Sequence, residues 1–127
     1  MAQHFTRHYT REEAKALLPQ VRQWLGQLEQ LRENLLKYDQ RLSSLMEPGC
    51  DVGGDLVNRW VRALADFRRL MTEFQRREIL VKDMDRGLVD FPAIIGGREV
   101  LLCWEKDEED IEFWHDLDSG YAGRERL

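Results

Sequence analysis

Residues 88–105 read LVDFPAIIGGREVLLCWE and carry the strongest folding signal in the chain. Two apolar, β-rich runs flank Gly96-Gly97, and two glycines in that setting predict a β-hairpin with a two-residue turn. The turn also sets the register, which places Asp90 opposite Cys103. Because paired residues point to the same face of a sheet, these two side chains are expected side by side.

A third strand is expected downstream of this hairpin. Residues 106–110 form a charged turn, and residues 111–115 read as a further strand. Pro92 has no N–H to give to a neighbour, so we expect its strand at the edge of the sheet. The result is a small three-stranded antiparallel β-meander with an irregular C-terminal tail. One of its apolar faces would pack on helices, and the other would need the tail or a partner.

Upstream, the chain has the periodicity of two long helices. Thr10 and Glu13 have capping-box spacing at the start of the first helix, and Pro19 predicts a kink within it. Apolar residues then recur at alternating steps of four and three: Leu17, Val21, Trp24, Leu28, Leu31, Leu35, Tyr38, Leu42 and Leu45. After a Gly- and Pro-rich loop at residues 48–54, Asp55 is a suitable N-cap, and the second helix repeats the pattern at Val57, Trp60, Leu64, Phe67, Met71 and Phe74.

These elements predict a single α+β domain, mainly α, over residues 1–127. A long antiparallel two-helix, coiled-coil-like hairpin takes residues 10–82, and the β element with its tail takes residues 83–127. The apolar surface is wider than one helix–helix contact can bury, because further apolar residues flank it: Leu18, Leu25, Leu56, Val61 and Leu70. We expect the C-terminal part and a second copy of the chain to cover them.

Composition narrows the protein class. The chain has 127 residues, 43% hydrophobic and 34% charged, and no apolar run approaches the roughly 20 residues of a membrane-spanning helix. Residues 1–10 hold no apolar stretch, so we expect no signal peptide, and two free cysteines suit a cytoplasmic protein. Residues 83–118 carry 12 acidic against 3 basic side chains, which argues against nucleic acid at the β element.

Several C-terminal motifs resemble a known family. They are GLVDFP at residues 87–92, GREV at 97–100 with Leu102-Cys103-Trp104, and WHDLD at 114–118 followed by Gly120, Gly123 and Arg124. Together with YTREEA at residues 9–14, they are similar to the bacterial family called domain of unknown function 2203. The turn after the Cys-Trp pair departs from the family, since Asp107-Glu108 replaces Gly-Glu. The resemblance implies a small cytosolic protein and supplies no activity or catalytic residue.

Asp90, Cys103 and His115 form the first candidate site. If the second turn pairs Cys103 with Phe113, His115 lies on the same face as the other two. All three are competent zinc ligands, but a closed zinc site takes four. We favour the reading in which Cys103 packs as a small apolar residue and the others are hydrogen-bonded. We therefore predict no cofactor, and keep a divalent metal as the less favoured alternative.

A ligand pocket on the β element is the second candidate. Aromatic residues such as Trp104 could line it, with His115, Asp118 and Arg124 at its rim. The favoured alternative is a compact aromatic core. Calcium binding at residues 116–120 fails the EF-hand pattern, so we expect a turn there, in which Asp118 accepts backbone N–H groups.

A line of basic residues on the second helix, Arg62, Arg69 and Arg76, is the third candidate. It could follow phosphates, but Asp66 and Glu73 stand at the spacing of ion pairs along a solvated helix face. Our leading functional hypothesis is a non-enzymatic interaction protein that forms a homodimer through its helical hairpin. A small-ligand or metal-binding domain is the alternative, and RNA binding through the second helix ranks third.

Overall fold

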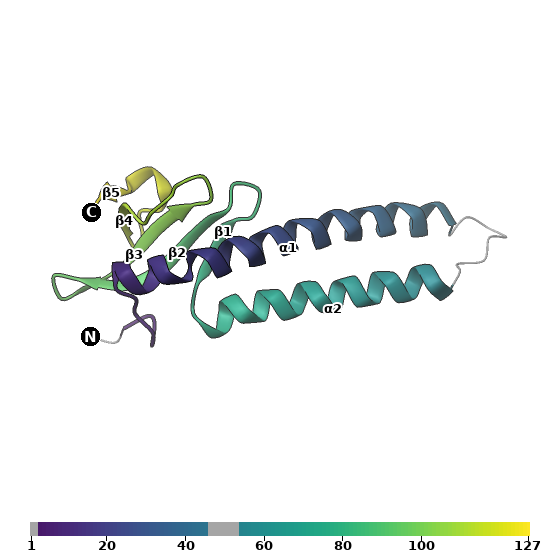
Figure 1. Cartoon of the computed structure of the whole chain (residues 1–127), viewed down its shortest axis with the longest axis horizontal. Helices are drawn as coiled ribbons and strands as arrows, with labels where there is room; N and C mark the ends of the chain where they lie inside the picture. The colour runs from purple at the N-terminus through teal and green to yellow at the C-terminus, as the bar shows by residue number, and fades with distance from the viewer. Residues whose placement is uncertain (1–2, 46–53) are drawn as a thin grey trace.

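The computed structural model describes residues 3–45 and 54–127 and has an α+β fold with an antiparallel helical hairpin, as predicted (Figure 1). The helices are α1 (Arg11–Leu45) and α2 (Gly54–Arg76). They are followed by one antiparallel five-stranded sheet whose strands are ordered as in the chain. The strands are β1 (Leu80–Asp83), β2 (Leu88–Ile95), β3 (Arg98–Glu105), β4 (Phe113–Asp116) and β5 (Glu125–Arg126), with a 3₁₀ turn η1 (Tyr121–Gly123) before the last. No helix of the described residues is long and apolar enough to cross a membrane.

The start of α1 follows the predicted capping box. The backbone N–H of Glu13 donates to Thr10 Oγ1, and the Thr10 N–H donates to Glu13 Oε1, each at 3.1 Å. The helix continues through Pro19, so the proline does not end it. Of the predicted loop, only Gly54 lies among the described residues, and it already belongs to α2. Asp55 is therefore not the N-cap but lies in the first turn, where it pairs with Arg59 at 3.1 Å.

The second helix ends six residues before the predicted limit of the hairpin at residue 82. Glu78 has a positive φ of 55°, and the N–H of Ile79 donates to the Phe74 carbonyl at 3.0 Å. This is the Schellman arrangement that ends helices, reinforced here by contact between two buried apolar residues, Ile79 and Phe74. The left-handed position usually holds glycine. Because a glutamate occupies it, the sequence lacked the ordinary signal for a helix end.

The central hairpin has the predicted register. Gly96 and Gly97 both have positive φ, as a two-residue turn of this kind requires, and Asp90 pairs with Cys103. The prediction that Pro92 marks an edge strand is wrong, because β2 lies between β1 and β3. Pro92 is accommodated because β1 begins at Leu80, opposite Asp90, and so does not pair with Pro92. On that side its carbonyl accepts from the Tyr9 N–H at 2.7 Å.

The predicted count of three strands is also wrong. Residues 80–83 form β1 and pair with β2 through an irregular register, whereas the prediction places residues 80–82 in the helical hairpin. Residues 125–126 of the tail form β5 and pair with β4. The predicted third strand is present but shifted, since β4 begins at Phe113. Both missed strands are too short for a clear alternation of apolar and polar residues.

The main core lies between α1 and one face of the sheet. Along α1 the buried residues are Ala14, Leu18, Val21, Leu25 and Leu28, which join Val89, Phe91, Ala93, Val100, Leu102 and Trp104 of β2 and β3. The predicted helix–helix contact thus shares only Val21 and Leu28 with this set. Leu18 and Leu25 are covered by the C-terminal part, as expected. Leu17 and Trp24 are half-buried, and Trp24 packs edge-on against Phe74 of α2.

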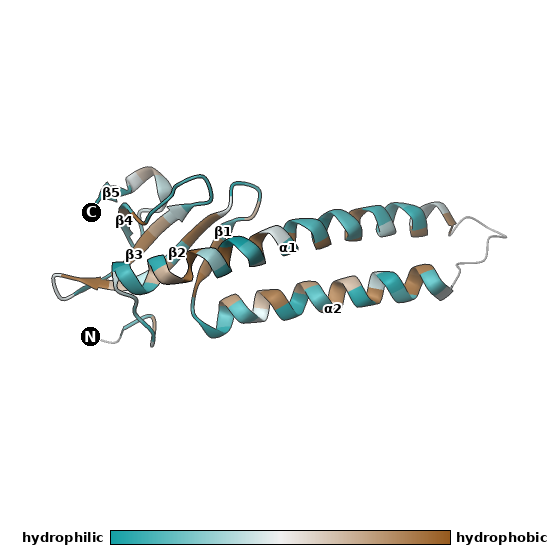
Figure 2. Cartoon of the chain, in the orientation of Figure 1, coloured by the Kyte–Doolittle hydropathy of each residue, from teal (hydrophilic) through white to brown (hydrophobic). Residues whose placement is uncertain are grey.

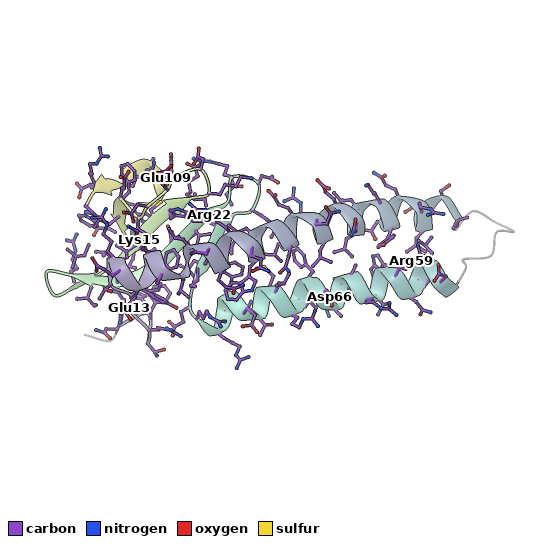
Figure 3. All side chains as sticks on the ribbon, in the orientation of Figure 1. Glu13, Lys15, Arg22, Arg59, Asp66 and Glu109 are labelled. Carbon is purple, nitrogen blue, oxygen red and sulfur yellow. The ribbon has the colours of Figure 1, made fainter. Side chains whose placement is uncertain are left out.

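The helical hairpin has two unlike halves. We call residues 11–30 and 63–76 the proximal half and residues 31–45 and 54–62 the distal half. Figure 1 shows the proximal part of α1 along the sheet and the distal half projecting beyond it. The distal half contains no buried residue, although hydrophobic positions continue along both helices there (Figure 2). Side chains crowd at the sheet end and only line the two helices at the other (Figure 3).

Candidate functional site

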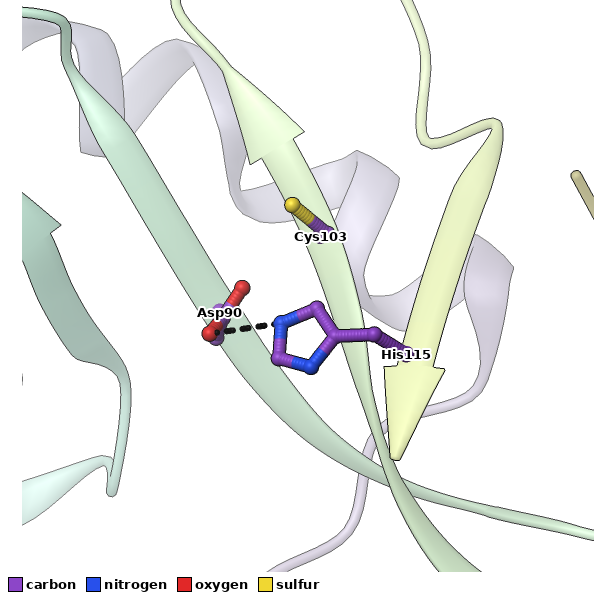
Figure 4. A group of neighbouring side chains, drawn as sticks. All are labelled: Asp90, Cys103 and His115. Atoms are coloured by element: carbon purple, nitrogen blue, oxygen red, sulfur yellow. Dashed lines mark hydrogen bonds and ion pairs between the residues drawn. The ribbon is translucent and has the colours of Figure 1, made fainter. Parts of the chain in front are cut away.

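Three polar side chains meet on the sheet face opposite α1. Asp90 comes from β2, Cys103 from β3 and His115 from β4, and Figure 4 shows them together with α1 behind the strands. The register explains the meeting: Asp90 pairs with Cys103, and His115 pairs with Leu101, two residues along β3. One donor atom from each lies within 4.8 Å of the others, and all three residues are buried. We call these three residues the polar cluster.

His115 is held at both ring nitrogens. Nδ1 lies 2.7 Å from the Asp116 carbonyl oxygen, and Nε2 lies 3.0 Å from Asp90 Oδ2. A carbonyl oxygen can only accept, so Nδ1 carries a proton and donates it. The contact between Nε2 and Asp90 then requires one further proton, which the two side chains share.

The burial of Asp90 disfavours its charged form more strongly than its hydrogen bonds favour that form. Burial raises the pKa of its carboxyl group, and the neighbouring His115 opposes that rise. Oδ2 is partnered by His115, whereas Oδ1 has no hydrogen-bond partner among the described residues. An orphaned oxygen of this kind is uncommon in a buried site and calls for an explanation.

Cys103 is a protonated thiol in this arrangement. It is 0% exposed, and burial raises its pKa to about 12, with the nearby Asp90 carboxyl acting in the same direction. A cysteine nucleophile needs a thiolate and access to substrate, and Cys103 has neither. Its sulfur remains available as a donor to a group bound inside the cluster.

Arg124 of the C-terminal tail lies against the polar cluster. Its Nη1 is 4.0 Å from Cys103 Sγ and 3.2 Å from Glu108 Oε1. Its guanidinium group also stands over the rings of Phe113 and Tyr121, at 3.9 and 4.3 Å. The tail therefore supplies a charge-compensated cation beside the cysteine sulfur. Of the three predicted rim residues, the structure brings His115 and Arg124 to the site.

Two other predicted site residues lie elsewhere. Trp104 follows Cys103 in β3, so its side chain points to the opposite face, where it is fully buried in the main core. Its Nε1 donates to the Glu108 carbonyl at 2.9 Å. Asp118 is exposed, and no hydrogen bond to it occurs among the described residues. The turn itself is present, with the Ser119 N–H donating to the Asp116 carbonyl at 3.2 Å and a positive φ at Gly120.

The basic line on α2 is largely paired. Arg69 lies 2.8 Å from Asp66 and Arg76 lies 4.0 Å from Glu73, which is the predicted pattern of a solvated helix face. These charges are therefore not a free track for phosphates.

Sequence reasoning missed an anchored carboxylate at Glu99. It accepts from the backbone N–H groups of His4 and Phe5, at 2.8 and 3.1 Å, and lies 2.7 Å from His8 Nε2. Burial opposes ionisation, but these hydrogen bonds prevail and lower the pKa of Glu99 to about 2. Nothing local in the sequence links residues so far apart.

Sequence reasoning also missed Glu108. Its carboxylate accepts from Arg124 and its carbonyl accepts from Trp104 Nε1. In the sequence it is one of several acidic residues in a charged turn, so nothing distinguishes it from its neighbours.

Comparison with known proteins gives a single assignment. A search among curated proteins returns no match, and neither does a search among solved structures. A family model described as an uncharacterized conserved protein, DUF2203, matches residues 7–127, which includes the helical hairpin and the whole sheet. This chain therefore belongs to the DUF2203 family of uncharacterized conserved proteins.

Proposed function

We propose that the protein is a non-enzymatic interaction protein that forms a homodimer through the distal half of its helical hairpin. The observation that carries this proposal is the lack of any buried residue in 31–45 and 54–62 of the described chain. Apolar residues occupy every turn of these helices. Two helices alone can bury only one apolar line from each partner, so the remainder needs another surface.

Exposed apolar side chains mark that surface. Leu36, Val57 and Val61 are 55%, 37% and 51% exposed, whereas Leu28 in the proximal half is fully buried. A hollow of about 280 Å³ lies where the two halves meet, lined by Gln27, Gln30, Leu31, Asp66, Arg69 and Leu70. Exposed apolar side chains on successive helix turns, such as Val57 and Val61, are a feature of protein binding surfaces.

A second copy of the chain is the occupant that best fits. Two hairpins packed side by side would make a four-helix, coiled-coil-like bundle, in which each helix buries a wider apolar face than in a hairpin. The distal half carries charges of both signs, including Arg59 and Asp55. Two copies that meet there are therefore not repelled by a surface of a single charge. Closed two-fold pairing is also the commonest form of self-association.

Light scattering on the full chain tests the proposal. A dimer has twice the 15.1 kDa chain mass, and Val57→Glu with Val61→Glu should return the mass to that of one chain. The matched control is Ile94→Glu with Ile95→Glu. These residues are similarly exposed, at 41% and 37%, but lie at the tip of the β2–β3 hairpin. A monomeric wild type at micromolar concentration, or a dimer broken only by the control, would contradict the proposal.

A further inference from the structure

We propose that Asp90, Cys103 and His115 form a binding site for a divalent transition metal, with Zn²⁺ as the best-fitting ion. The cluster offers one carboxylate oxygen, one sulfur and one imidazole nitrogen, which are the three ligand types that zinc uses in proteins. These donor atoms already lie within 4.8 Å of one another. Since they come from three adjacent strands, the sheet holds them together without help from a loop.

The orientation of His115 fits a metal ligand. Its Nδ1–H donates to the Asp116 carbonyl at 2.7 Å, which fixes the ring and turns Nε2 toward the cluster. A histidine that binds metal through one nitrogen commonly donates its other N–H to a carbonyl or carboxylate in this way.

The unpartnered Asp90 Oδ1 is the independent observation. Asp90 is 1% exposed, and the one donor beside this oxygen among the described residues is the Cys103 thiol, which is a weak donor outside ordinary hydrogen-bond geometry. A buried carboxylate oxygen without a partner is costly, and a bound cation is one of the few groups that can satisfy it in a closed space. A bound cation would therefore satisfy the Asp90 oxygen that the hydrogen bond with His115 leaves without a strong partner.

Charge balance also favours a divalent ion. Without metal the cluster is neutral overall, because Cys103 is a thiol and one proton is shared by Asp90 and His115. Binding breaks the S–H bond, forms a metal–sulfur bond, and releases the thiol proton and the shared proton to solvent. The dication, one thiolate and one carboxylate again sum to zero. The oxidation state of the metal does not change.

Arg124 of the C-terminal tail lies next to the proposed metal ligands. Arg124 Nη1, at 4.0 Å from Cys103 Sγ, can donate to the metal-bound thiolate, and Glu108 balances the guanidinium charge. The described residues provide three ligands, one fewer than a closed structural zinc site. The class of site we infer is therefore three protein ligands with one coordination position left for water or a small anion.

Cobalt titration of the full chain, first stripped with a chelator, tests the site. We expect one Co²⁺ per chain, a near-ultraviolet sulfur-to-cobalt charge-transfer band, and release of two protons in weakly buffered solution. Cys103→Ser should abolish the band, and Cys50→Ser should keep it. His115→Gln or Asp90→Asn should weaken binding beyond the roughly 10- to 100-fold loss typical of a second-shell partner. The matched control His8→Gln should leave binding unchanged.

The Cys50→Ser variant decides the matter even if Cys103→Ser fails to fold, since Cys103 is then the only thiol in the chain. Absence of the band in this variant, binding of cobalt without the band, or no stoichiometric binding would each overturn the proposal. The readout does not depend on oligomeric state, so the outcome is separate from that of the light-scattering test.

Discussion

The two halves of the helical hairpin have the same kind of sequence and opposite environments. In the proximal half of α1, Val21 and Leu28 of the alternating apolar line lie under the sheet and are completely buried. In the distal half the alternation continues through Leu35 and Leu42, which are only half-buried, and Leu36 beside this line is 55% exposed. A helical apolar pattern therefore shows that a surface needs covering, but not what covers it. In the proximal half the chain supplies the cover itself, and we infer that a second copy supplies it in the distal half.

The largest expected effect lies in the polar cluster, which belongs to the sheet that covers the proximal half of α1. In metal-free protein, His115→Ala should lower the free energy of unfolding by about 3–5 kcal/mol, because it leaves Asp90 buried without its partner. Urea denaturation at neutral pH measures this. Arg98→Ala is the control, since it breaks an exposed ion pair with Asp116 and should cost about 1 kcal/mol or less. A similarly small loss for His115→Ala would mean that the cluster contributes little to folding.

Two leucines of α1 provide the most direct comparison of the halves. Leu28→Ala should cost about 2–5 kcal/mol, because it opens a cavity in the main core. Leu36→Ala should change stability by no more than about 0.5 kcal/mol in a monomeric background such as Val57→Glu with Val61→Glu. Denaturation of both variants in that background measures the difference. Equal losses would show that the distal half is packed within one chain.

Protein concentration should affect the stability of the wild type. If folding is coupled to dimerisation, each tenfold rise in concentration adds about 1.4 kcal/mol to the free energy of unfolding per dimer. Thermal unfolding over a hundredfold concentration range measures this, with Val57→Glu and Val61→Glu as the background in which the dependence should vanish. An unfolding temperature that does not change with concentration would argue against a second copy.

The smallest effect should come from Glu99, which anchors the N-terminal segment to β3. Its pKa is lowered from 4.5 to about 2, so its ionised form favours the folded state. This contribution is fully present above pH 4.5 and is lost as the pH falls toward 2. Glu99→Gln should therefore be less stable than wild type near neutral pH, with the difference shrinking over that acidic window. Acid denaturation curves of the two proteins check this, and a difference that persists at pH 2 would contradict the assignment.

The sequence predicted the central hairpin and the polar cluster correctly, because a two-glycine turn determines register and register determines faces. The same register also determines the position of Trp104. Because Trp104 directly follows Cys103 in β3, its side chain must point to the opposite face of the sheet. The predicted pocket combines Trp104 with His115 at its rim, although the register places these two side chains on opposite faces of the sheet.

What the sequence could not predict came from distant contacts and unusual local geometry. The end of α2 depends on Glu78 in a left-handed conformation, a position that sequence rules reserve for glycine. The short β1 and β5 strands exist because neighbouring strands pair with them, not because of their own patterns. Likewise, α1 has two overlapping lines of apolar residues. The line that contains Leu18 and Leu25 becomes part of the core because the sheet lies on that side of the helix.

Hydrogen exchange at varied protein concentration tests the central claim most directly. We predict that amide protection in residues 31–45 and 54–62 rises with concentration, whereas protection of the core strands β2 and β3 changes much less. The Val57→Glu and Val61→Glu variant should show low, concentration-independent protection in the distal half. If the distal half of the wild type is as strongly protected at the lowest concentration as at the highest, it is stable within one chain, and the proposed dimer surface is contradicted.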